Sequence, residues 1–279
     1  MKIIDIILGF FKSIFKKPSD DCDNCTDRTV CQTLDKNKKF ALVVGMETSR
    51  WGSCPGADQD SNTMNAMISK YVDSSHIVRL NNKQATVAAF KKALTEQIEK
   101  VPEDGLLILT YSGHGGQYNK SSTAKDETDG QDEFLCLYDG ALIDNDLWEM
   151  FGWCKGRVVC IYDCCHSGTM YRLPSVEGEC EGEALEREPL ESPFFSKYEN
   201  VRDVSRRMLV FSGCGEETVS WGDRNGGVMT NSMKRAFNKC LTYREWWNKF
   251  KADSSFKKVK QVPICTKIGA FDVNAKVFN

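Results

Sequence analysis

The feature that most restricts the fold of this chain is a series of short apolar runs separated by longer segments with helical periodicity. Five runs have the length of a β-strand: Phe40–Gly45, Ile77–Leu80, Leu106–Tyr111, Val158–Tyr162 and Met208–Ser212. Three of them are nearly continuous in apolar residues, which is typical of strands that are buried on both faces. The chain is therefore predicted to contain a sheet covered on both sides.

Helical segments lie between these runs, at Asp60–Tyr71, Thr86–Lys100, Asp144–Phe151 and Gly227–Cys240. Strands that alternate with helices indicate right-handed crossovers, and so an α/β fold with a parallel sheet between helices. The residues from Tyr243 to Lys260 are interpreted as a helix and a basic loop. In folds of this class, ligand sites gather at the carboxyl ends of the strands.

Composition excludes several classes of protein. At 279 residues the chain is long enough for one well-buried domain. Its net charge of −2 gives no general attraction to nucleic acid, so no nucleic-acid partner is expected. The 13 cysteines are an odd number, and several lie in strand-like runs. They are interpreted as reduced thiols of a cytoplasmic protein.

Residues 1–17 are predicted to form an amphipathic helix, because their apolar side chains recur at helical spacing. The segment is too short and too charged to span a bilayer. Two interpretations stay open: a helix docked on the domain, or a peripheral membrane anchor assisted by Lys12, Lys16 and Lys17. Residues 18–37 are predicted to be a polar linker. The linker contains three cysteines, Cys22, Cys25 and Cys31. We interpret them as surface thiols rather than as zinc ligands, because no fourth ligand is nearby.

Two of the apolar runs end in polar residues suited to nucleophilic catalysis. The run at 106–111 continues as Ser112-Gly113-His114-Gly115-Gly116, and the run at 158–162 continues as Asp163-Cys164-Cys165-His166-Ser167-Gly168. If the two strands are neighbours, about 4.8 Å apart, His114 and Cys165 leave the same sheet edge side by side. A thiolate is a strong nucleophile, and a nearby imidazole can activate it and protonate a leaving amine. We predict Cys165 as the nucleophile and His114 as its acid–base partner.

The plainer interpretation of a cysteine at a strand end is a small buried hydrophobic residue. The coincidence of a glycine-flanked histidine with a cysteine at two strand ends favours catalysis instead. Backbone N–H groups of Gly115 and Cys165 are then candidates for holding an oxyanion. His76 precedes a strand far from a candidate nucleophile and is interpreted as structural, whereas His166 points away from Cys165.

The two blocks YSGHGG (111–116) and DCCHSG (163–168) closely resemble the catalytic blocks of metacaspases, a family of caspase-like peptidases. The resemblance continues through DETDGQDEFLCLYDG (126–140), FSGCGEETVSWGD (211–223) and a final strand at Gln261–Thr266, so that it covers about residues 38–268. It implies a caspase-like domain over 38–279. That domain would contain a single, mostly parallel six-stranded sheet flanked by helices on both faces.

The resemblance also implies a cysteine endopeptidase that cleaves after Arg or Lys, with Asp60, Ser112 and Asp163 forming the pocket for the basic side chain. This is physically sensible, because two carboxylates in a partly dry pocket remain costly until a cation pairs with them. An alternative for Asp60 is a helix N-cap ahead of Ser61–Tyr71. Cys164 is interpreted as a packing residue, with a redox role as the alternative.

Many metacaspases require calcium, and here the match to the family is incomplete. Asp129 and Asp144 remain as candidate calcium ligands. Where the family has two adjacent acidic residues, however, this chain has Asp144-Asn145, and Arg172 stands where the family has an acid after the cysteine. A cation there would repel a divalent ion that needs several oxygen ligands. We therefore expect no cofactor and no strict dependence on calcium.

Residues 172–206 are predicted to be an acidic surface loop, and self-cleavage within it at a basic residue is a hypothesis that stays open. The expected partners are protein or peptide substrates of a monomeric enzyme. A rival interpretation is a catalytically idle scaffold that binds a partner, perhaps at a membrane. A serine hydrolase based on Ser167 is disfavoured, because the chain has no GxSxG elbow there.

Overall fold

The computed structural model describes residues 35–119, 131–164, 206–214 and 219–279. The predicted N-terminal helix, the cysteines of the linker and the acidic loop up to residue 205 lie outside this part of the chain. Within the part that is described, no helix is long and apolar enough to cross a bilayer.

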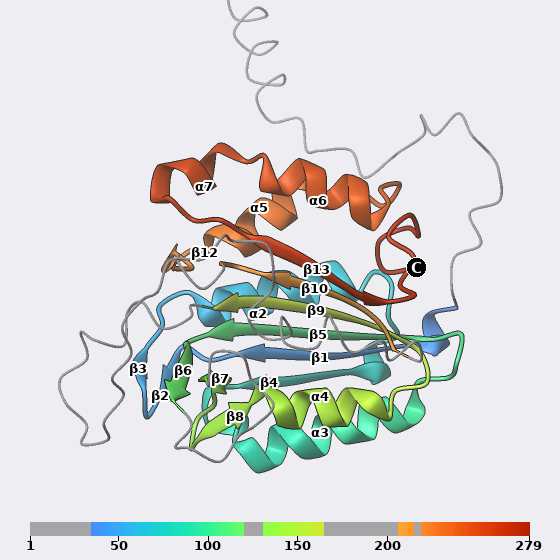
Figure 1. Cartoon of the computed structure of the whole chain (residues 1–279), viewed down its shortest axis with the longest axis horizontal. Helices are drawn as coiled ribbons and strands as arrows, with labels where there is room; N and C mark the ends of the chain where they lie inside the picture. Colours follow the sequence, from blue (N-terminus) through green and yellow to red (C-terminus); the bar gives the residue numbers. More distant parts are fainter. Residues whose placement is uncertain (1–34, 120–130, 165–205, 215–218) are drawn as a thin grey trace, which may run out of the picture. The chain divides into compact units, whose positions relative to one another are not determined.

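The centre of the fold is a six-stranded sheet in the order β13-β10-β9-β5-β1-β4 (Figure 1). Its strands are β1 (Lys39–Gly45), β4 (Ile77–Asn81), β5 (Leu106–Gly113), β9 (Arg157–Cys164), β10 (Arg207–Ser212) and β13 (Ile264–Gly269). All neighbouring pairs are parallel except β10 and β13, which are antiparallel. The predicted α/β class with a mostly parallel six-stranded sheet is confirmed.

Helices cover both faces of the sheet (Figure 1). The helices are α2 (Ala57–Ile68), α3 (Val87–Lys100), α4 (Asp144–Gly152), α5 (Val228–Ala236), α6 (Tyr243–Lys251) and α7 (Ser254–Val259). Helices α3 and α4 pack on one face, and α2, α5, α6 and α7 contribute to the core on the other. Along β1, Leu42 and Val44 face the first layer whereas Ala41 and Val43 face the second. This two-sided burial explains the nearly continuous apolar run.

Short elements extend the ends of the main strands. They are the 3-10 turns η1 (Lys36–Lys38), η2 (Ser74–His76) and η3 (Asn82–Gln84), and the small strands β2 (Thr48–Ser49), β3 (Gly52–Ser53), β6 (Gly115–Asn119), β7 (Gln131–Cys136), β8 (Ala141–Ile143), β11 (Gly222–Asp223) and β12 (Gly226–Gly227). Strands β2 and β3 pair after β1, β6 pairs with β7 after β5, and β11 pairs with β12 after β10. Three antiparallel ribbons therefore follow the carboxyl ends of β1, β5 and β10.

Several predicted boundaries differ from the structure, in three elements by three or more residues. Helix α2 begins at Ala57 with Gly56 as its N-cap, so the alternative of Asp60 as an N-cap is wrong. Helix α5 ends at Ala236, because Phe237 adopts extended backbone and its ring packs against Trp246 with centroids 5.7 Å apart. The last strand is Ile264–Gly269 rather than Gln261–Thr266, since Pro263 has no N–H to donate to a ladder.

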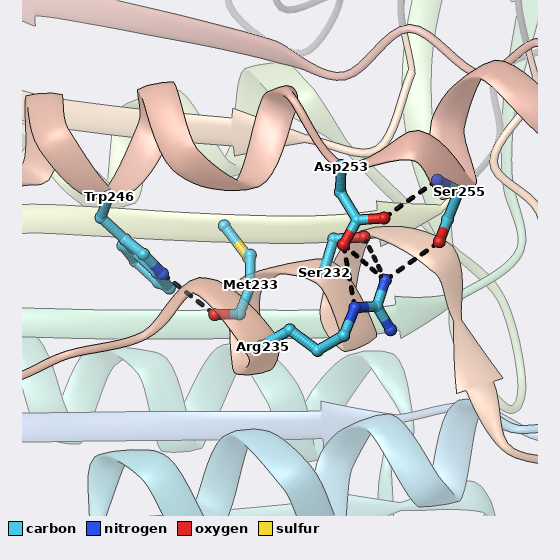
Figure 2. Close-up of polar contacts among 6 residues, drawn as sticks. All are labelled: Ser232, Met233, Arg235, Trp246, Asp253 and Ser255. Atoms are coloured by element: carbon cyan, nitrogen blue, oxygen red, sulfur yellow. Dashed lines mark hydrogen bonds and ion pairs between the residues drawn. The ribbon is translucent and has the colours of Figure 1, made fainter.

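The residues from Tyr243 to Lys260 form two helices, so the prediction of a basic loop after the first helix is wrong. Ala252 is the C-cap of α6, and Asp253 caps α7 by accepting a hydrogen bond from Ser255 N. Both helices hold α5 in place (Figure 2). The indole N–H of Trp246 donates to the carbonyl oxygen of Met233 at 3.0 Å, and the guanidinium of Arg235 donates to Asp253 at 2.8 Å. Helix α5 is thus fixed at two points, to α6 and to the N-cap of α7.

Candidate active site

The two strands that carry the candidate catalytic blocks are neighbours. Strands β5 and β9 pair in parallel, with Ser112 opposite Asp163 and Gly113 opposite Cys164. His114 follows the last of these pairs on one strand, and Cys165 follows it on the other. Cys165 itself lies outside the described residues, as do His166 and Ser167. The structure therefore establishes the strand pairing on which the predicted Cys–His arrangement depends.

The β2–β3 ribbon positions the imidazole of His114. The His114 Nε2 lies 3.0 Å from the carbonyl oxygen of Ser53. A carbonyl oxygen can only accept, so this contact places the ring proton on Nε2 and leaves the lone pair on Nδ1. Ser53 carries no catalytic pattern in the sequence, because its contribution is a backbone oxygen.

A buried tyrosine fixes the backbone of the same loop. The Tyr111 hydroxyl lies 2.6 Å from the carbonyl oxygen of His114 and 2.8 Å from that of Cys136, and Cys136 N donates to the His114 carbonyl at 3.0 Å. Gly113 is needed beside them, because a Cβ there would lie 2.7 Å from the Tyr111 hydroxyl. Burial raises the pKa of Tyr111 well above its ordinary value, so the hydroxyl stays protonated and can donate.

The three predicted pocket residues come together beneath the same sheet edge. Ser112 of β5 donates from its Oγ to Asp60 Oδ2 of α2 at 2.6 Å, and Asp163 lies opposite Ser112 on β9. Asp60 and Asp163 are 4% and 6% exposed. Burial, and secondly the charge of Asp163, raise the pKa of Asp60 to about 8, and burial also raises the pKa of Asp163. We call Asp60 and Asp163 the acidic pair.

No lysine or arginine among the described residues forms a salt bridge with the acidic pair. Two neighbouring buried carboxylates are costly when both are ionised, and a cation between them removes that cost. The electrostatics of this site therefore favour a positively charged ligand.

A second set of residues, which the sequence analysis did not single out, hydrogen-bonds the acidic pair. Thr230 on α5 donates to Asp163 Oδ2 from its backbone N at 2.9 Å and from its Oγ1 at 2.8 Å. Ser220 donates to Asp163 Oδ1 at 2.6 Å, and Gln261 donates to Ser220 Oγ at 3.1 Å. Gly227 N donates to Asp60 at 2.8 Å. The sequence gives no periodic signal for these residues, because they meet only after α5 and β13 have packed.

Three further residues from the sequence analysis, Gly115, Cys164 and His76, lie in the described part of the chain. Gly115, the predicted oxyanion residue, begins β6 directly after His114. Cys164 is buried in the core, where its carbonyl oxygen accepts from the Cys214 thiol at 3.5 Å, in keeping with a packing role. His76 stacks on Phe40 with ring centroids 4.3 Å apart, as a structural histidine does.

Of the two candidate calcium ligands, only Asp144 lies in the described part of the chain. It is buried at the start of α4, and its Oδ1 accepts from Asn145 N at 2.8 Å. Asp129 lies outside the described residues. In the described segments, no three His, Cys, Asp or Glu side chains are grouped so that they could hold a metal ion.

The amino-acid sequence is similar to those of several metacaspases. The chain is 27% identical over 189 residues to metacaspase-3 of Trypanosoma brucei brucei, covering 61% of this chain and 51% of that protein. It is 25% identical over 287 residues to metacaspase-3 of Arabidopsis thaliana, covering 86% and 75%. Metacaspase-3 of Trypanosoma cruzi is matched over 39% of its length. The chain thus spans about half or less of the trypanosome relatives it matches.

Solved structures agree on the fold. A crystal structure of a Geobacter sulfurreducens protein superposes with a TM-score of 0.66 at 22% identity, covering 86% of this chain and 98% of that one. Caspase-1 from Spodoptera frugiperda superposes with a TM-score of 0.55 at 13% identity, covering 88% and 93%. The family model described as the caspase domain matches residues 38–270. The chain therefore belongs to the caspase-domain family, Peptidase C14.

Proposed function

We propose that this protein is a cysteine endopeptidase that hydrolyses peptide bonds after Arg or Lys, with Cys165 as nucleophile and His114 as acid–base residue. The observation that carries the proposal is the acidic pair. Asp60 and Asp163 are buried without a cationic partner among the described residues, and Asp163 precedes Cys165 by two residues. A substrate cation drawn to these carboxylates is held close to the sulfur.

In the proposed reaction, the Cys165 thiolate attacks the carbonyl carbon of the bound Arg or Lys residue, which belongs to the peptide bond to be cleaved. A C–S bond forms while backbone N–H groups of Gly115 and Cys165 hold the oxyanion. The protonated His114 then gives its proton to the amine as the C–N bond breaks. Water, deprotonated by His114, attacks the thioester and releases the acid product and the thiol.

The contacts of His114 support this role. Because Nε2 is engaged by the Ser53 carbonyl, Nδ1 is the ring nitrogen left to exchange a proton with a thiol. The Tyr111 hydroxyl and Cys136 N hold the His114 backbone, so that the ring is carried by a constrained loop. A histidine held in this way resembles an oriented general base rather than a surface side chain.

Arginine fits the acidic pair better than lysine does, because a planar guanidinium can bond two carboxylate oxygens at once. The proposal also includes activity without added calcium. Its support is that Asp144 already accepts a hydrogen bond from the first turn of its own helix, and that the sequence has Asn145 and Arg172 where acids are expected.

The proposal is tested with peptides that differ only at the residue before the cleaved bond: Arg, Lys, norleucine and Asp. We expect cleavage in the order Arg, Lys and then norleucine, with none after Asp, and loss of all cleavage in Cys165→Ala and His114→Ala. Equal cleavage of the norleucine and Arg peptides would refute the specificity, and residual cleavage by Cys165→Ala would refute the nucleophile.

Self-processing is a further part of the proposal, because basic residues occur in the acidic segment 172–206. Purified wild-type chain should yield fragments ending at such a residue, and Cys165→Ala should stay intact. The same fragments from Cys165→Ala would assign the cuts to another protease.

A further inference from the structure

The backbone of two glycines lies against the acidic pair. Gly227 N donates to both oxygens of Asp60, at 2.8 and 3.0 Å. A Cβ on Gly226 would lie 2.3 Å from Asp60 Oδ1, and one on Gly227 would lie 2.1 Å from Asp163 Oδ2. These two residues therefore touch both carboxylates at distances that leave no room for a methyl group.

In this arrangement the acidic pair offers little open surface to a substrate cation. Asp60 is only 4% exposed and Asp163 only 6%, whereas a guanidinium must form hydrogen bonds to their oxygens. Since Gly227 N already occupies Asp60, some group must move before the proposed substrate can bind. The group that moves should be the least firmly held of those that cover the pair.

Most of the groups around the pair are firmly anchored. Thr230, which bonds Asp163, is on α5, and α5 is tied to the neighbouring helices through Trp246 and Arg235 (Figure 2). Ser112, which bonds Asp60, is in the buried central strand β5. Both are held by elements whose displacement would disturb the core.

The turn that carries Gly226 and Gly227 is held more lightly. It is the short β11–β12 ribbon, whose residues 222–225 are all exposed. Gly226 has φ of +107°, a conformation that glycine adopts with little strain. Trp221 N anchors one end of the ribbon on Gln261 at 3.0 Å, and Gly227 is the N-cap of α5 at the other. Val228 N donates to the Trp221 carbonyl at 2.7 Å, and Asn231 Nδ2 donates to the Asn225 carbonyl at 3.2 Å. Movement is thus confined to the peptide unit between Gly226 and Gly227, which carries the Gly227 N–H and can rotate while both ends of the ribbon stay fixed.

We propose that Gly226 and Gly227 form a latch that holds Asp60 through the Gly227 N–H in the unliganded protein and is displaced from Asp60 when a substrate arginine or lysine enters. This inference rests on the proposed function. The exchange is favourable, because a neutral N–H donor on the carboxylate is replaced by a positively charged donor, which adds the attraction between opposite charges to the hydrogen bond. The latch makes entry selective, because a side chain without a positive charge gains too little to displace it.

The test measures hydrogen exchange at the Gly227 amide by NMR in the full chain. The protein is compared free, labelled with a peptidyl-arginine chloromethyl ketone, and labelled with the matching citrulline compound, which has nearly the same shape but no charge. We expect the arginine adduct to speed exchange at Gly227 at least tenfold and the citrulline adduct to leave it unchanged. The Val210 amide in β10 should keep its protection in all three samples.

An arginine adduct on Cys165 with unchanged exchange at Gly227 would overturn the latch while leaving the proposed function intact. Failure of the arginine compound to label Cys165 would overturn the proposed function, and the latch as a substrate gate would fall with it.

A pair of variants tests the resting contact without any substrate. Asp60→Ala removes the acceptor and should speed exchange at Gly227 in the free chain, whereas Asp60→Asn keeps an oxygen there and should retain most of the protection. Equal protection of Gly227 in wild type and Asp60→Ala, with Val210 unchanged, would show that the latch does not hold Asp60.

Discussion

Ser112 and Asp163 face each other across the parallel strands β5 and β9, one residue before Gly113 and Cys164 form the last pair of that ladder. Ser112 donates to Asp60, so this single register position connects α2, β5 and β9 in one acidic site. The proposed specificity pocket and the proposed catalytic residues therefore depend on the same strand pairing. Changes to one can be separated from changes to the other by measuring KM and kcat independently.

Replacing Asp163 by Asn should abolish most of the preference for Arg, because the buried carboxylate is the proposed partner of the substrate cation. Truncating one side of a buried charge pair costs about 2–5 kcal/mol, or roughly 30-fold to several thousandfold in kcat/KM for an Arg peptide. The control is Asp146→Asn, which removes a half-exposed salt bridge to Lys91 on another face. An Asp163→Asn enzyme that still cleaves Arg peptides at the wild-type rate would contradict the assignment.

The affinity for Arg substrates should rise with pH. Burial and the neighbouring Asp163 raise the pKa of Asp60 to about 8, so below that value Asp60 holds its proton and attracts a cation weakly. As the pH increases from 6.5 to 9, Asp60 ionises and KM for an Arg peptide should fall.

KM for the norleucine peptide should stay nearly constant over the same range, and Asp60→Asn should remove the trend for Arg. A KM for the Arg peptide that is independent of pH in the wild type would contradict the role of Asp60.

His114 should carry its proton on Nε2 when the imidazole is neutral, because Nε2 lies 3.0 Å from the Ser53 carbonyl oxygen, which can only accept. The tautomer is read from the ¹⁵N chemical shifts of the labelled imidazole, with His114→Gln used to assign the signal. A neutral ring with its proton on Nδ1 would show that Ser53 does not orient it.

Tyr111→Phe should lower kcat several-fold with KM within about twofold, because the hydroxyl 2.6 Å from the His114 carbonyl fixes the loop that carries the imidazole. The lost buried hydrogen bond should also reduce the free energy of unfolding by about 1–3 kcal/mol.

The matched control is Tyr243→Phe. Its buried hydroxyl accepts from Phe278 N at 3.0 Å, on the opposite side of the sheet. This variant should lose similar stability and keep kcat. Equal effects of the two variants on kcat would reduce Tyr111 to a purely structural role.

Activity should change less than twofold between a chelator and millimolar calcium, because the predicted ligand set is incomplete at Asn145 and Arg172. The measurement is a calcium titration of the cleavage rate with chelator-treated protein. An enzyme that is inactive until calcium is added would contradict this expectation and would favour Asp129 and Asp144 as calcium ligands.

Much of the fold could be read from local patterns. The five apolar runs lie at β1, β4, β5, β9 and β10 because continuous burial on both sheet faces leaves a signal within a few consecutive residues. The positions of His114 and Cys165 after two of these runs followed from the same pattern. The ends of helices and strands were less certain, since Phe237 leaves the helix for an aromatic contact that no local pattern records.

The sequence by itself determined the main strands and helices, and which reactive side chains follow the strands, because both are encoded over short stretches of chain. Only the tertiary structure decided that β5 lies beside β9, and that Thr230, Ser220 and the Gly227 N–H meet the acidic pair. Gly227 and Asp60 are 167 positions apart. Contacts at such separation arise only when whole helices and strands pack together, and hydrophobic periodicity carries no information about them.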